Sequence, residues 1–132
     1  MFTASNITPA ENIQTELWEI QQFLEEPFFS DNPTACKERL VILSQHMARS
    51  GVLKAHAEWH YSNMYNGAVM SAIKQLAEVN MSTSTINKYI ESLCKDFKVL
   101  VTMSDRTNRA TVHASDSIRT IISFAKQERF YQ

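Results

Sequence analysis

Residues 84–129 decide the fold, and they read STINKYIESLCKDFKVLVTMSDRTNRATVHASDSIRTIISFAKQER, without a glycine or a proline. Apolar side chains return along most of this stretch at intervals of three or four positions, which places them on one face of an α-helix. They are Ile86, Tyr89, Ile90, Leu93, Phe97, Leu100, Val101, Ile118, Ile121, Ile122 and Ala125. Such a helix is roughly 65–70 Å long at ~1.5 Å per residue. A lone helix cannot hide this stripe, so the preceding chain must supply a partner.

The composition favours an all-α protein. Of the 132 residues, 44% are hydrophobic, two are Gly and three are Pro, and all three prolines lie in the first quarter of the chain. A β-rich chain needs turn residues every 8–12 positions or so, and this sequence does not provide them. We therefore predict one all-α domain over residues 1–132.

Two helix starts are visible upstream. Thr8-Pro9-Ala10-Glu11 places Thr at the N-cap, Pro at N1 and Glu at N3, so a capping box should open a helix over residues 10–26. Pro27 ends that helix. Asn32-Pro33 repeats the cap-then-proline signal and opens a helix over residues 33–79, which we expect to be continuous or gently kinked at Ser50-Gly51. Between the two helices, Phe28 and Phe29 are expected to tuck under the first.

These elements predict a long antiparallel hairpin of helix 33–79 against helix 84–129, with the shorter helix 10–26 packed across it. If residue 79 lies opposite residue 84, residue 54 lies opposite residue 109. Cys36 and Cys94 are then roughly 50 Å apart, whereas the Cα atoms of a disulfide lie within ~7 Å. We expect two reduced, buried thiols.

The net charge of −1 conceals an asymmetry. Residues 1–31 contain no Lys or Arg, and residues 32–132 hold all thirteen bases. The acids of the first segment are Glu11, Glu16, Glu19, Glu25, Glu26 and Asp31. An acidic N-terminal arm therefore precedes a mildly basic hairpin.

Polar residues interrupt the apolar stripe of the last helix between Met103 and Ser117. The predicted register places this segment opposite residues 46–60, which are also polar. A buried polar seam must be hydrogen-bonded or hydrated. In one interpretation, small polar residues fix the register of the two helices; they are Ser104, Thr107, Thr111 and Ser115.

A second interpretation is a metal site in which His56 and His60, four positions apart on one helix face, share an ion with Asp105. The sequence His56-Ala57-Glu58-Trp59-His60 lacks the Glu directly after the first His that zinc proteases require. We therefore predict no metal, no cofactor and no catalytic residue, and keep these three only as candidate ligands.

A third interpretation is a binding surface for phosphate-bearing partners such as nucleic acid. Its bases are Arg49, Lys54, Arg106, Arg109 and Arg119, with Trp59, Tyr61 and Tyr65 as stacking groups. The chain has no run of five Lys or Arg residues, and scattered bases usually form an ordinary solvated face.

A hairpin of this length cannot bury all of its aromatic and Met side chains, which indicates self-association, most simply a twofold dimer that forms a four-helix bundle. The N-terminus lacks the pattern of a signal peptide, and no apolar run approaches the ~20 residues of a membrane span. We expect a cytoplasmic protein that does not contact a membrane.

Two stretches, MARSGVLKAHAEWH at 47–60 and INKYIESLCKDF at 86–97, resemble small uncharacterised proteins encoded in phages and prophages of Bacteroides-type bacteria. The likeness covers roughly residues 38–128. It implies a phage accessory protein, such as a nucleic-acid-handling helper, an assembly factor or an inhibitor of a host protein, and it assigns no site residue. The sequence thus predicts a non-enzymatic, self-associating interaction module, with an accessory nucleic-acid-binding protein as the alternative.

Overall fold

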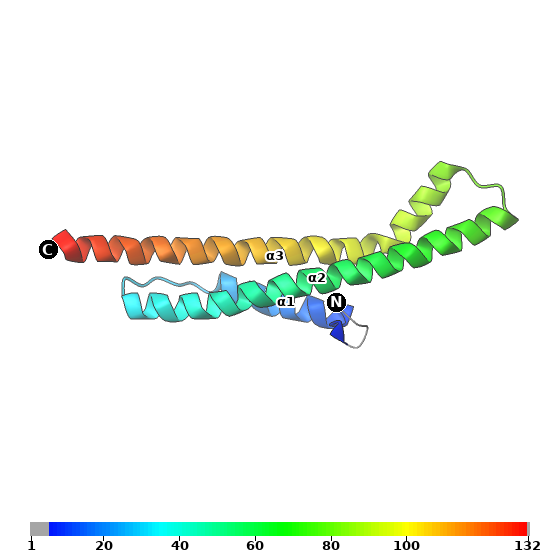
Figure 1. Ribbon diagram of the computed structural model, residues 1–132. Coiled ribbons are helices and arrows are strands. Elements are labelled where there is room, and N and C mark those ends of the chain that lie inside the picture. Colours follow the sequence, from blue (N-terminus) through cyan, green and yellow to red (C-terminus); the bar gives the residue numbers. More distant parts are fainter. Residues whose placement is uncertain (1–5, 132) are drawn as a thin grey trace.

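The computed structural model describes residues 6–131, apart from the side chains of residues 76, 77, 130 and 131. It consists of three α-helices, α1 (Ala10–Glu25), α2 (Pro33–Glu78) and α3 (Thr83–Tyr131) (Figure 1). No strand occurs in this part of the chain. α2 and α3 form a long antiparallel pair with α1 packed on it, which confirms the predicted all-α hairpin.

The start of α1 differs from the prediction. Pro9 occupies the N-cap position, and no side chain caps the helix. The hydroxyl of Thr8 is instead engaged by His56 and Arg49 of α2, so it is not used for the first N–H groups of α1. The predicted capping box is therefore wrong, because contacts with another helix take the hydroxyl that the local pattern assigns to the cap.

The starts of the other two helices follow local rules. The Asn32 side chain accepts a hydrogen bond from the backbone N–H of Thr34 at 3.0 Å, and Pro33 follows it at the first helical position. α2 then continues through Gly51 without a break. At the tip of the hairpin, the Ser82 hydroxyl accepts from the N–H of Thr85 at 3.2 Å, and α3 begins one residue earlier than predicted.

Of the two phenylalanines expected to tuck under the first helix, only Phe28 packs in the core. Phe28 packs beside the buried residues Cys36 and Ile118, and the guanidinium of Arg39 lies 5.4 Å from the centre of its ring. Phe29, the next residue, is 94% exposed. Neighbouring side chains of this non-helical connector therefore point to different sides, and only one reaches the core.

The core consists of three separate clusters. In the middle of the molecule, Ile13, Leu17 and Ile20 of α1 pack against Leu53, Ala57 and Leu100 of the helix pair. A second cluster, near the start of α2, contains Cys36, Leu43 and Ile118. The third cluster holds Ala68, Ala72, Ile90 and Cys94, which come from α2 and α3 alone. The molecule is therefore a three-helix bundle that continues as a two-helix arm, which we call the distal arm (residues 61–97).

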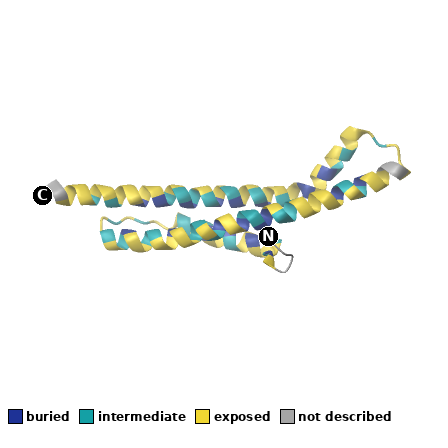
Figure 2. Ribbon diagram, viewed as in Figure 1, coloured by how far each residue is buried: buried dark blue, intermediate teal, exposed yellow. Residues whose placement is uncertain are grey.

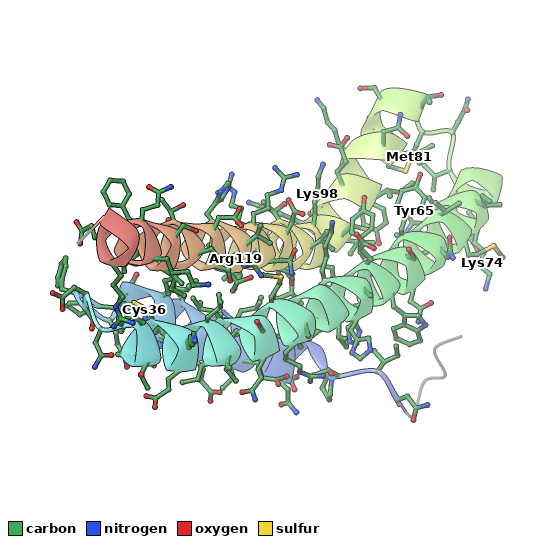
Figure 3. All side chains as sticks on the ribbon, turned by 60° about the vertical axis from the view of Figure 1, so that its left-hand side comes forward. Cys36, Tyr65, Lys74, Met81, Lys98 and Arg119 are labelled. Carbon is green, nitrogen blue, oxygen red and sulfur yellow. The ribbon has the colours of Figure 1, made fainter. Side chains whose placement is uncertain are left out.

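The distal arm is less covered than the bundle. α1 runs alongside α2 in the opposite direction, with Thr8 near His60 and Phe23 near Arg39, so it ends before the distal arm begins. α3 bends within its first third, and its first turns leave the line of the rest of the helix (Figures 1 and 3). Exposed residues cover most of the surface there (Figure 2).

The register of the helix pair differs from the prediction by about one turn. Lys54 pairs with Asp105, with Nζ 3.0 Å from Oδ1, instead of lying opposite residue 109. The prediction assumed two straight helices with residue 79 opposite residue 84. Because α3 bends, that assumption does not hold, and the pairing beyond the bend is shifted. Cys36 and Cys94 are both free and buried, as expected, and they belong to different core clusters.

Candidate functional site

The predicted polar seam is buried and saturated with hydrogen bonds. The hydroxyls of Ser104, Thr111 and Ser115 donate to backbone carbonyls of α3 itself, at 2.8, 2.6 and 2.8 Å. Among the described residues, no buried side-chain nitrogen or oxygen lacks a partner. The hydroxyls of these three residues are thus used within α3, and the geometry favours the interpretation that the seam fixes register.

Asn108 provides the contact between helices that this interpretation requires. Its Nδ2 atom donates to the carbonyl of Met47 and to the hydroxyl of Ser50 on α2, both at 3.0 Å. The Ser50 hydroxyl in turn donates to the Met47 carbonyl at 3.0 Å. A shift of one helix by a single residue would break this set of bonds, so Asn108 sets the alignment of α3 on α2.

The candidate metal ligands form two separate sets of contacts. The Thr8 N–H donates to His56 Nδ1 at 3.1 Å, and His60 Nε2 donates to the Thr8 carbonyl at 2.7 Å. Asp105 instead binds Lys54 and Arg109, at 3.0 and 3.1 Å. No group of three metal-ligating side chains forms in the described part of the chain.

The histidines therefore belong to a latch that holds the segment before α1, which we call the Thr8 latch (Thr8, Glu16, Arg49, His56 and His60). Arg49 donates to both carboxylate oxygens of Glu16, at 2.9 and 2.8 Å, and to the Thr8 hydroxyl at 3.2 Å. The hydrogen bond with Glu16 raises the pKa of Arg49. Since Nδ1 of His56 accepts the Thr8 N–H, that nitrogen carries no proton in this arrangement.

Electrostatics around the latch agree with a neutral imidazole. Burial, Arg49 and His60 lower the pKa of His56, with Glu16 acting in the opposite direction. Burial and the charge of Arg39 lower the pKa of His46. On the other side of α2, the hydrogen bond from Lys54, with the charge of Arg109, lowers the pKa of Asp105 against the effect of burial.

Four of the five predicted bases form ion pairs within the chain. Arg49 binds α1, Lys54 and Arg109 share Asp105, and Arg119 pairs with Asp116 on its own helix at 3.3 Å. Tyr61 stacks on Tyr65, with ring centres 6.2 Å apart, and Trp59 meets His60 edge-on at 5.2 Å. Of the predicted bases, Arg106 is the one with no carboxylate of a described residue within ion-pair distance.

A surface that the sequence reading missed lies between α1 and α3. A hollow of about 390 Å³ separates Glu11 and Gln14 of α1 from Val99 and Met103 of α3. A second hollow of about 380 Å³ adjoins it, because it shares Val99 and Met103. The bases around this second hollow are Lys95, Lys98 and Arg106, and Lys98 lies close to the bend of α3 (Figure 3).

Trp18 extends this surface along α1. Residues 11, 14 and 18 share one flank of a helix, and the first two of them border the hollow with α3. Trp18 is 60% exposed, so it lies outside the buried face of α1. Helical spacing could have predicted this exposure, because Trp18 lies off the buried stripe of Ile13, Leu17 and Ile20.

Comparison of the chain with protein-family models, curated proteins and solved structures finds no match. None of the described helices is both long and apolar enough to cross a bilayer.

Proposed function

We propose that the chain is a non-enzymatic, self-associating helical interaction module that acts in the cytoplasm. Its accessible surface carries the proposal, at 9334 Å². A compact monomer of 15.1 kDa exposes about 7,100 Å² by the usual scaling with mass. The surplus of about 2,200 Å² matches the area that one protomer loses in a large, obligate dimer interface.

The chemistry of the exposed surface supports the same proposal. Six large, exposed apolar side chains are described in the distal arm, where α1 does not reach; they are Met64, Tyr65, Met70, Ile73, Val79 and Leu93. Large apolar areas left open on a folded chain usually mark contact with another protein. A second copy is the simplest partner because it is always present with the first.

A role as a phage accessory protein that acts on a protein partner is the second part of the proposal. The suggestion of phage origin comes from the resemblance of residues 47–60 and 86–97 to small phage-encoded proteins. The partner would meet an elongated, mixed apolar and charged surface, and the same surface area supports this part of the proposal.

The test uses two differently tagged versions of the full chain, expressed together and purified through one tag. Random pairing into dimers predicts that the second tag is recovered at about half the amount of the first. Recovery of the first tag alone, at a protein concentration in the high micromolar range, would remove the proposal.

The alternative function is accessory binding of nucleic acid. The observation that favours it is the group of Lys95, Lys98 and Arg106 around one hollow, since no carboxylate of a described residue lies within ion-pair distance of the three. Titration of labelled single- and double-stranded DNA at low salt tests it. Binding that falls steeply with added salt and with Arg106→Ala/Arg109→Ala supports this alternative, and an absence of binding at low salt removes it.

A further inference from the structure

We propose that the face between α1 and α3 binds a second copy of this chain in a twofold, reciprocal contact. In this contact, Trp18 of each copy packs on Val99 and Met103 of the other, and acids of α1 meet bases of α3. This inference rests on the proposed self-association and specifies the surface that produces it.

The first argument is the distribution of charge that the fold leaves without internal partners. Within the acidic arm, Glu16 pairs with Arg49 and Glu26 pairs with Arg39. No base of a described residue lies within ion-pair distance of Glu11 or Glu25. On α3, no carboxylate of a described residue lies within ion-pair distance of Lys95, Lys98 or Arg106, and no base of a described residue lies within that distance of Asp96, which borders the α1–α3 hollow. The chain therefore presents an acidic surface on α1 and, on α3, a surface with three bases and one acid.

The second argument is that the two surfaces have matching patterns. Glu11 and Glu25 lie seven positions before and after Trp18, on the same flank of α1. Lys95 and Arg106 likewise enclose Val99 and Met103 on α3. The acids span about 21 Å along their helix and the bases about 16 Å along theirs, a difference that long side chains can cover. Each surface thus has charges at its ends and apolar groups at its centre.

The third argument is that the two surfaces adjoin. Glu11 and Gln14 of α1 border the same hollow as Val99 and Met103 of α3. A twofold axis through this hollow places the acidic surface of each copy on the basic surface of the other, as an isologous interface requires. The part of the distal arm before Lys95 is also apolar and exposed, but the charges described there form no pattern that identifies what covers it.

The apolar centre has the residue types that carry binding energy. Trp is among the residues most enriched at energetic hot spots, and Trp18 is exposed in the single chain. Val99 is 50% exposed and Met103 is 38% exposed. These two side chains line both hollows, so they offer a concave apolar site to an indole ring.

The experiment measures the dimer dissociation constant of the full chain by sedimentation, for two charge-reversed variants. They are Glu11→Lys/Glu25→Lys and Lys95→Glu/Arg106→Glu. Each variant alone should dimerise at least about tenfold more weakly than the wild type, because like charges then face each other. An equimolar mixture of the two should form heterodimers, because both charged contacts are then attractive again. Trp18→Ala should also weaken the dimer about tenfold or more.

The control is Lys126→Glu/Arg129→Glu, which makes the same change of charge as the basic variant but in the last turns of α3, outside both the α1–α3 face and the distal arm. Both bases are exposed, and neither has a carboxylate of a described residue within ion-pair distance. This variant should dimerise like the wild type. Circular dichroism of every variant checks that the helices form.

The outcomes separate this inference from the proposed function. A wild-type dimer that the reversals do not weaken, or a mixture that forms no heterodimer, overturns the α1–α3 interface and leaves self-association standing. A wild-type chain that stays monomeric overturns both. A monomer that binds DNA through Lys95 and Arg106 would assign the basic surface to nucleic acid instead.

Discussion

Replacing Asn108 by Ala tests whether the polar seam sets the register of α3 on α2. The Asn108 side chain donates two hydrogen bonds to α2, to the Met47 carbonyl and the Ser50 hydroxyl. Each bond contributes about 1 kcal/mol net, so their loss costs about 2 kcal/mol. Ala gains about 0.5 kcal/mol of helix propensity over Asn. The variant should therefore lose about 1.5 kcal/mol of unfolding free energy.

The assay is urea unfolding followed by circular dichroism, at one fixed protein concentration because association shifts apparent stability. The matched control is Asn66→Ala, an exposed position of α2, where only the propensity changes and the chain should gain about 0.5 kcal/mol. The two variants should thus differ by about 2 kcal/mol, the contribution of the two hydrogen bonds. Equal shifts in both variants would refute the register role of Asn108.

Three further predictions concern the helices, the latch and the candidate metal ligands. Gly51→Ala and Gly67→Ala should each stabilise the chain by about 0.5–1 kcal/mol in urea unfolding, because Ala favours a helix over Gly. There is room for the added methyl group, since a Cβ at Gly51 would lie 3.7 Å from the Asn108 amide and one at Gly67 would meet nothing within 4 Å. A loss of stability in either variant would contradict the geometry. Stability should fall on acidification, because burial and Arg49 hold the pKa of His56 below its ordinary value of 6.5. Below about pH 6.5 the unfolded chain binds a proton at His56 more readily than the folded chain does. The stability that neutral His56 contributes is therefore complete above about pH 6.5 and is lost as the pH falls through the lowered pKa of His56 in the folded chain. Unfolding at several pH values should show a smaller acid loss for His56→Gln than for the wild type, whereas the same change at exposed His113 should leave the acid loss as it is; equal losses in all three would contradict the latch. Elemental analysis after gentle purification should find no stoichiometric zinc, iron or manganese, and one equivalent of any of them would reopen the metal interpretation.

Local chemistry explains which parts of the fold the sequence predicts. The starts of α2 and α3 depend on Asn32, Pro33 and Ser82, whose effects extend over three or four residues. The absence of Gly and Pro from residues 84–129 predicts the length of α3 for the same reason. These features require no knowledge of what packs against the helix.

The missed features depend on contacts between helices. Thr8 satisfies the sequence rule for an N-cap, but His56 and Arg49 take its hydroxyl, and no local pattern indicates this. Helical spacing also predicts which face a base occupies without predicting which carboxylate meets it, so the pairing of Lys54 with Asp105 was one turn from its expected place.

The same limit applies to the candidate surface. Periodicity identifies Ile13, Leu17 and Ile20 as the buried stripe of α1, and Trp18 lies off that stripe. Whether Trp18 meets α3, solvent or a second copy depends on how α1 is placed on the helix pair. The α1–α3 hollow became visible only when that placement was known.

The mass of the full chain in solution, measured by sedimentation equilibrium from low to high micromolar concentration, tests self-association most directly. The surplus of exposed surface predicts that the mass rises to twice 15.1 kDa. A single species of 15.1 kDa over the whole range would contradict it.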